Sequence, residues 1–154
     1  MEQRLSVILI AHNEEQAIGP MLKGLLSSYD REILEVIVVD DASKDRTAEI
    51  VRDWAKGNPK IRLIQRTPPC GVGRALKTGF GNINPQSEYA LTMDCDFVEN
   101  IAQVRGLLNA IEEQDCDGVI GSRFVQGGKV VGYPLLKRLM NRLFHMIVRT
   151  LFQI

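Results

Sequence analysis

The stretch Val36-Ile37-Val38-Val39-Asp40-Asp41 joins four β-favouring apolar residues to two acids that follow them directly. An apolar run without polar alternation is typical of a strand that is buried on both faces of a parallel sheet. Similar short runs occur at residues 5–10, 61–64, 89–93 and 118–121. Helical patterns lie between them, beginning near residues 13–17 and 43–45 and covering 71–80 and 101–113. This alternation predicts an α/β fold with a mostly parallel sheet and helices on both faces.

Length and composition agree with one cytoplasmic globular domain. The chain has 154 residues, of which 45% are hydrophobic and 25% charged, and its formal net charge is zero. Its three cysteines, Cys70, Cys95 and Cys116, form no C-x-x-C pair, which argues against a disulfide framework or a zinc site. The apolar run at residues 5–11 is too short for a signal peptide or a membrane span. We therefore expect a cytoplasmic protein without a nucleic-acid partner.

The run Leu91-Thr92-Met93-Asp94-Cys95-Asp96 contains two carboxylates separated by one residue. Residues two apart in a strand project to the same side, so Asp94 and Asp96 should point together at the carboxyl end of the strand. Close carboxylates repel unless a cation lies between them, and Mg²⁺ or Mn²⁺ prefers oxygen ligands. The motif predicts that Asp94 and Asp96 hold a metal that bridges a diphosphate. Two solvated acids in a turn are the alternative for such a motif taken alone.

Other expected strands also end in polar residues. The first is followed by His12-Asn13-Glu14-Glu15, the second by Asp40-Asp41 and the fifth by Ser122-Arg123. Acids at this edge suit sugar and ribose hydroxyls, and Arg123 suits a phosphate because its guanidinium presents a planar fork of donors. Helix capping alone is the alternative for Asn13, Asp40 and Asp45.

Five motifs in this order resemble family 2 glycosyltransferases of the GT-A fold, a Rossmann-like α/β architecture. Within that family the sequence is most similar to polyprenol-phosphate sugar transferases, the dolichol-phosphate mannose synthase group. The motifs are Ile-Ala-His-Asn-Glu-Glu (10–15), Val-Val-Asp-Asp-Ala-Ser-Lys-Asp-Arg-Thr (38–47), Gly-Val-Gly-Arg-Ala-Leu-Lys-Thr-Gly-Phe (71–80), Met-Asp-Cys-Asp (93–96) and Gly-Ser-Arg-Phe (121–124).

This resemblance implies a nucleotide-sugar donor, GDP-mannose or a UDP-sugar. His12 and Glu14 would line the nucleotide pocket, and Val39 with Asp41 would hold the base and the ribose.

The resemblance also implies the residues of the reaction centre. Asp94, Cys95 and Asp96 would hold the diphosphate through Mg²⁺ or Mn²⁺, with Asp96 and Arg123 next to the bond that breaks. The metal would stabilise the departing diphosphate as a Lewis acid. A polyprenyl phosphate acceptor arrives already ionised, so the reaction needs no strong general base.

Residues 134–154 predict a basic amphipathic helix within the same domain as residues 1–133. Its apolar positions recur at helical spacing: Leu136, Met140, Leu143, Ile147 and Leu151. The segment after Asp117 has six cations and no acid, which favours an anionic partner. The resemblance places Arg138 and Arg142 at the phosphate of the lipid acceptor. Three interpretations stay open: packing on the sheet, a peripheral helix at the inner face of the membrane, and self-association into a homo-oligomer.

The sequence departs from the family pattern in places. Ile10 stands where proline is common, and Val98 stands where a further polar metal ligand often lies. The family continues past the position of Ile154 with a segment that closes over the donor, so we expect a C-terminally truncated chain. A catalytically silent nucleotide-sugar-binding module is the alternative to a working transferase. A sugar nucleotidyltransferase is a third interpretation, but the chain lacks the glycine-rich basic loop after the first strand.

Overall fold

The computed structural model describes residues 4–96, 98–114, 116–122 and 135–152. The chain divides into two compact units, Met1–Arg105 and Gly106–Ile154, and each is described by itself.

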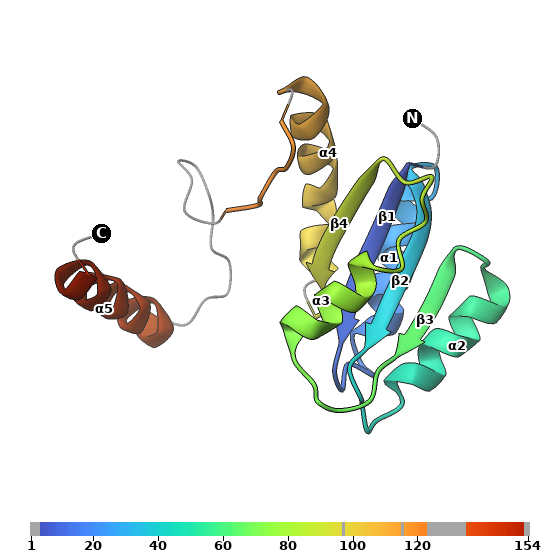
Figure 1. Cartoon of the computed structure of the whole chain (residues 1–154), viewed down its shortest axis with the longest axis horizontal. Coiled ribbons are helices and arrows are strands. Elements are labelled where there is room, and N and C mark those ends of the chain that lie inside the picture. The colour runs from blue at the N-terminus through green and yellow to red at the C-terminus, as the bar shows by residue number, and fades with distance from the viewer. Residues whose placement is uncertain (1–3, 97, 115, 123–134, 153–154) are drawn as a thin grey trace. The chain divides into compact units, whose positions relative to one another are not determined.

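The first unit contains a four-stranded parallel sheet (Figure 1). Its strands are β1 (Leu5–Ala11), β2 (Ile33–Asp40), β3 (Ile61–Gln65) and β4 (Tyr89–Asp94), and their spatial order is β3-β2-β1-β4. Val7, Leu9 and the apolar run of β2 from Val36 to Val39 are fully buried. This confirms the parallel sheet and the burial of its central strands on both faces.

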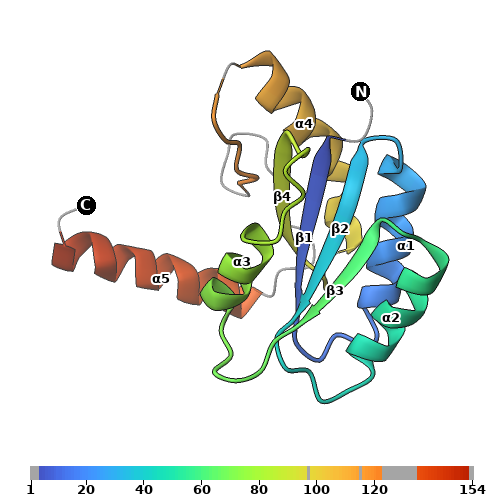
Figure 2. The same cartoon turned by 45° about the vertical axis from the view of Figure 1, so that its right-hand side comes forward.

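Helices cover both faces of this sheet, as the sequence predicts. The helices α1 (Ile18–Tyr29) and α2 (Thr47–Gly57) lie on one face, and α3 (Val72–Phe80) lies on the other (Figures 1 and 2). The face toward α3 is apolar because Ile8, Ile37 and Val39 project from it and pack with Ala75 of the helix. Gly79 allows this approach, since a Cβ atom there would lie 2.5 Å from Cγ2 of Ile8.

The order of the strands reverses beside β1. The chain runs from β1 through β2 to β3 on one side, and α3 then carries it back to β4 on the other side of β1. Right-handed crossovers place α3 on the face opposite α1 and α2. Open α/β sheets bind ligands at the carboxyl ends of their strands, at the point where the order reverses. Here that point lies between β1 and β4, where Ile10 pairs with Asp94.

The helix expected at 101–113 begins earlier and in a tighter form. A 3₁₀ helix, η1 (Val98–Gln103), precedes α4 (Val104–Glu113). The hydroxyl of Tyr29 donates to the carbonyl of Ile101 at 3.0 Å and accepts from the amide of Arg105 at 3.2 Å. This junction therefore depends on a side chain of α1 rather than on a local capping residue.

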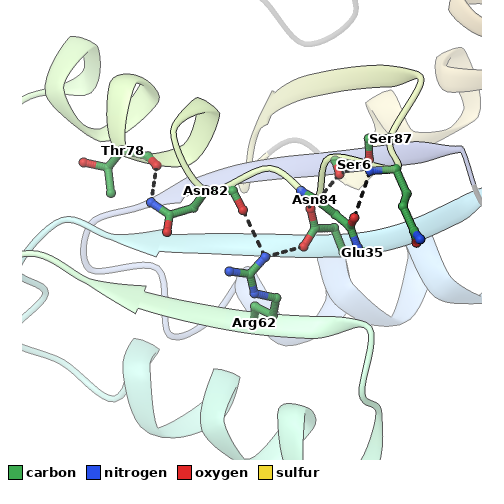
Figure 3. A network of polar contacts seen from close by, with 8 residues as sticks. Ser6, Glu35, Arg62, Thr78, Asn82, Asn84 and Ser87 are labelled. Carbon is green, nitrogen blue, oxygen red and sulfur yellow. Dashed lines mark hydrogen bonds and ion pairs between the residues drawn. The ribbon is translucent and has the colours of Figure 1, made fainter.

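A buried polar network ties the α3–β4 connection to the amino-terminal part of the sheet (Figure 3). The carboxylate of Glu35 on β2 accepts hydrogen bonds from the Ser6 hydroxyl at 2.7 Å, the Asn84 amide at 2.6 Å and the Arg62 guanidinium at 2.6 Å. Burial by itself would raise the pKa of Glu35, but these hydrogen bonds hold the pKa below its ordinary value. The carboxylate is therefore stabilised in its ionised form.

The second unit contains α4 from Gly106 onward and the helix α5 (Leu135–Phe152), which confirms the predicted helix near residues 134–154. The strand predicted at 118–121 is wrong, because residues 118–122 form no strand in the described structure. Two of these residues, Gly118 and Gly121, have low β propensity, and the side chain of Ile120 is 90% exposed. No helix among the described residues is long and apolar enough to cross a membrane.

Candidate functional site

The acidic motif lies at the carboxyl end of β4. Asp94 is the last residue of the strand, and Asp96 follows in the adjoining turn. Exposure alternates as the motif requires: Asp94 and Asp96 are exposed, whereas Met93 is half-buried and Cys95 is buried. This pattern agrees with two carboxylates that project away from the core on the same side. Their role as metal ligands stays a prediction.

Cys95 points into the protein between these two acids. Its thiol donates a hydrogen bond to the backbone carbonyl of Ile10 at 2.6 Å, which joins the turn after β4 to β1. Burial raises the pKa of Cys95 to about 12, and the nearby carboxylates of Glu14, Asp96 and Asp94 act in the same direction. The thiol is therefore protonated at neutral pH, and only the backbone of Cys95 is left for the predicted contact with the diphosphate.

Glu14 brings a third carboxylate close to the motif. It lies in the loop after β1, where its amide donates to the Thr47 hydroxyl at 2.8 Å. Burial raises the pKa of Glu14, and the charges of Asp96, Asp45 and Asp94 raise it further, while His12 opposes them. The edge of the sheet at β1 and β4 is therefore electrostatically suited to a cation.

Hydrogen bonds join the loop after β1 to the loop after β2. The amide of Asn13 donates to the Ser43 hydroxyl at 2.9 Å, and the amide of Lys44 donates to Oδ1 of Asn13 at 2.8 Å. The two carboxylate oxygens of Asp45 accept from the amides of Thr47 and Glu15, each at 3.0 Å. Asp45 thus accepts from the amide of the first residue of α2, but the N-cap position is occupied by Arg46, whose side chain makes no capping hydrogen bond. The side chain of Asn13 binds the other loop instead of capping α1.

His12 is exposed beside the end of β2. Its Nδ1 lies 2.8 Å from the backbone carbonyl of Asp41. Because a carbonyl oxygen only accepts, Nδ1 carries the proton and Nε2 is the nitrogen left for another contact.

The structure limits the ligand contacts available to the two residues that the resemblance assigns to the base and the ribose. The side chain of Val39 is buried in the core beneath α3, and its backbone lies in the ladders with Ile10 of β1 and Ile64 of β3. The carboxylate of Asp41 pairs with the guanidinium of Arg66 and accepts from the amide of Gly71 at 2.6 Å. Sequence reasoning missed Arg66, although it directly follows β3 and so obeys the same strand-end rule that selected the other residues.

Three predicted residues cannot be placed. Arg123 lies outside the described residues, and so do the side chains of Arg138 and Arg142 in α5. Within the described part of the chain, no group of three or more histidine, cysteine or acidic side chains is arranged to hold a metal ion.

The fold and this edge define an α/β domain with a candidate ligand site at the carboxyl ends of its strands. Residues 6–153 match the model of glycosyl transferase family 2, and the chain belongs to this family.

Similar curated proteins and solved structures support the same assignment. A dolichol-phosphate mannosyltransferase of Pyrococcus furiosus is 30% identical over 139 residues, which are 90% of this chain and 38% of that protein. An undecaprenyl-phosphate mannosyltransferase of Micrococcus luteus is 32% identical over 139 residues, which are 90% of this chain and 56% of that protein. The chain thus spans about half or less of the length of these relatives.

Two solved structures share the architecture. A mannosyltransferase of Pyrobaculum calidifontis in complex with GDP-Man and Mn²⁺ has a TM-score of 0.54 and 31% identity, covering 62% of this chain and 28% of that one. Glucosyl-3-phosphoglycerate synthase of Mycobacterium tuberculosis, in complex with Mn²⁺, UDP and phosphoglyceric acid, has a TM-score of 0.57 and 27% identity, covering 71% and 39%. The fold is therefore the GT-A fold, as the sequence predicts.

Proposed function

We propose that the chain binds a nucleotide sugar at the carboxyl edge of β1, β2 and β4 and transfers the sugar to a polyprenyl phosphate. The observation that carries the proposal is the acidic edge at the point where the strand order reverses. Asp94 and Asp96 are exposed there, and their charges help to raise the pKa of Glu14. The names of the curated relatives support a polyprenyl-phosphate acceptor and a mannosyl or glucosyl donor.

The residues at this edge fit a hard divalent cation. Asp94 and Asp96 offer exposed carboxylate oxygens, the ligand type that Mg²⁺ and Mn²⁺ prefer, and their repulsion favours a cation between them. When bound, the metal would neutralise negative charge on the departing nucleoside diphosphate. Complexes of two structural neighbours contain Mn²⁺, which supports a divalent cation at this edge.

The nucleoside would lie beside the ends of β1 and β2. His12 has its Nε2 free of the contact with Asp41, and the charges of both His12 and the acidic motif act on Glu14. Val39 and Asp41 lie at the end of the second strand. GDP-mannose and UDP-sugars are both donor candidates. This arrangement would leave Asp96 and Arg123 for the reaction centre.

The acceptor would be a lipid phosphate held by the basic C-terminal segment, with Arg138 and Arg142 as its ligands. Six described apolar side chains of α5 are exposed: Met140, Leu143, Phe144, Met146, Ile147 and Leu151. Exposed apolar residues on a basic helix suit the interface of an anionic membrane. We propose that residues 134–154 belong to the same domain as residues 1–133 and bring it to the cytoplasmic face of the membrane.

The test has two parts. The chain is first titrated with GDP, UDP, GDP-mannose and UDP-glucose in the presence of Mn²⁺ and then of chelator, with the thermal midpoint of unfolding as readout, because a ligand that binds only the folded state raises it. Vesicles that contain a polyprenyl phosphate are then added with radiolabelled donor, and labelled lipid is counted. A metal-dependent shift with labelled lipid supports the proposal. Binding without labelled lipid would identify a nucleotide-sugar-binding module, and no shift with any nucleotide would refute the proposal.

A further inference from the structure

The residue that follows β3, Arg66, is half-buried at the carboxyl edge of the sheet. Its backbone amide donates to the carbonyl of Asp40 at 2.9 Å, which extends the pairing of β2 and β3 by one residue. Its side chain is 13% exposed, and the side chain of Asp41 is 6% exposed. The two charges therefore face each other largely out of water, where partial desolvation makes an ion pair more sensitive to geometry than on the surface.

Arg66 uses its guanidinium in two directions. One terminal nitrogen donates to Oδ1 of Asp41, and the other donates to the carbonyl of Pro69 at 3.3 Å. The two terminal nitrogens of the planar guanidinium make these contacts from fixed, separate positions, whereas the one nitrogen of a lysine would have to lie within reach of both acceptors.

Asp41 in turn holds the far end of the same loop. Its second carboxylate oxygen accepts from the amide of Gly71 at 2.6 Å, and its backbone carbonyl accepts from the thiol of Cys70 at 3.4 Å. Gly71 has a φ of 142°, a conformation that favours glycine, and α3 begins at the next residue. Together Arg66 and Asp41 bind three points of the loop at residues 66–71.

This loop follows the edge at which the donor is proposed to bind. Figure 1 shows the connection from β3 to α3 passing along the arrowhead ends of the strands. Both carboxylate oxygens of Asp41 already accept hydrogen bonds, one from Arg66 and one from Gly71. These contacts fix the orientation in which the carboxylate would contact a nucleoside.

We propose that Arg66 is a positioning residue for the nucleoside half of the donor, because it clamps Asp41 and Pro69 and so sets the wall of the nucleoside pocket. This inference rests on the proposed function, since it requires a nucleotide at this edge. The clamp lies at β2 and β3, on the other side of β1 from the acidic motif of β4. It should therefore affect the recognition of the base and ribose and leave the diphosphate and metal contacts unchanged.

The experiment compares Arg66→Lys with the unaltered chain by calorimetric titration of GDP, UDP and inorganic pyrophosphate, each with Mn²⁺. Loss of one directed hydrogen bond should weaken the preferred nucleotide about tenfold. The ratio of the GDP and UDP dissociation constants should also move toward one, because a displaced wall discriminates less between bases. The affinity for pyrophosphate should not change. A general loss of folding would reduce all three affinities together.

Arg62→Lys is the matched control, since Arg62 lies near the start of β3, at the opposite end from Arg66, and also pairs with an acid of the β2 segment, Glu35. It should leave all three affinities unchanged. The double variant Asp41→Asn with Arg66→Gln removes both charges without leaving either one unpaired, and it should reproduce the loss of base discrimination.

The outcomes separate the two proposals. Unchanged nucleotide affinity in Arg66→Lys, or an equal loss for pyrophosphate, overturns the clamp while the proposed function stands. Failure of the unaltered chain to bind either nucleotide overturns both.

Discussion

The thiol of Cys95 donates to the backbone carbonyl of Ile10, so the turn that carries the acidic motif is pinned to the neighbouring strand. The bond crosses the point at which the order of the strands reverses. Cys95 therefore joins the two sides of the candidate site while the acids on either side of it face outward.

This relationship predicts the reactivity of the cysteines. Burial raises the pKa of Cys95 to about 12, and only the thiolate reacts with an alkylating reagent. At pH 8, iodoacetamide should label the exposed Cys70 and leave Cys95 unlabelled until the protein is unfolded. Mass spectrometry of the digested protein measures this directly. Equal labelling of both residues in the folded protein would contradict the buried position of Cys95.

The acidic motif predicts a loss of metal-dependent binding. Because Asp94 and Asp96 are proposed to share one cation, Asp94→Asn should weaken Mn²⁺-dependent nucleotide binding about tenfold or more. Asp53→Asn is the control, since Asp53 is an exposed acid of α2 that pairs with Lys56. Calorimetric titration of both variants gives the comparison, and equal affinities would remove the metal assignment.

Close packing of α3 predicts opposite effects for two glycines of that helix. A Cβ atom at Gly79 would lie 2.5 Å from Cγ2 of Ile8, so Gly79→Ala should reduce the free energy of unfolding by about 1–3 kcal/mol. At Gly73 a Cβ atom meets nothing within 4 Å, so Gly73→Ala should be neutral or stabilise by up to about 1 kcal/mol through helix propensity. Urea unfolding of the two variants measures both effects. A neutral Gly79→Ala would mean that α3 does not lie against β1 this closely.

Glu35 predicts a pH dependence of stability. The pKa of Glu35 is lowered in the folded protein, so its contribution is complete above the ordinary value of 4.5 and is lost as the pH falls through the lowered pKa. Glu35→Gln should therefore destabilise the protein at pH 7 by about 1–3 kcal/mol. Below pH 4.5 the difference from the unaltered chain should shrink. Urea unfolding at several pH values measures both, and a difference independent of pH would argue against an ionised Glu35.

The C-terminal helix predicts binding to anionic membranes. Vesicles that contain phosphatidylserine should bind the chain, and added salt should weaken this binding by screening the basic residues. Ile147→Ser should weaken it at all salt concentrations, because Ile147 is an exposed apolar residue of α5. Sedimentation with vesicles provides the measurement. Binding that salt does not change would exclude the electrostatic part of the proposal.

Some elements could be predicted from local pattern alone. The run from Val36 to Val39 predicted a strand buried on both faces, and all four residues are fully buried. Asp94 and Asp96 follow from the two-residue period of a strand, and the exposure of both agrees with it. The strand predicted at 118–121 is wrong because two of its four residues, Gly118 and Gly121, have low β propensity and leave only two apolar residues to favour a strand.

The sequence by itself determined the α/β alternation, the family and the residues that end the strands, because these depend on the period and type of neighbouring residues. Only the tertiary structure decided which of those residues meet. Asp41 and Arg66 are 25 positions apart, and the register of β2 and β3 brings their charges together. Cys95 and Ile10 are 85 positions apart, and they form a hydrogen bond because β4 lies next to β1 in the sheet. Such contacts depend on strand order and register, and neither property can be predicted from the residues of one strand.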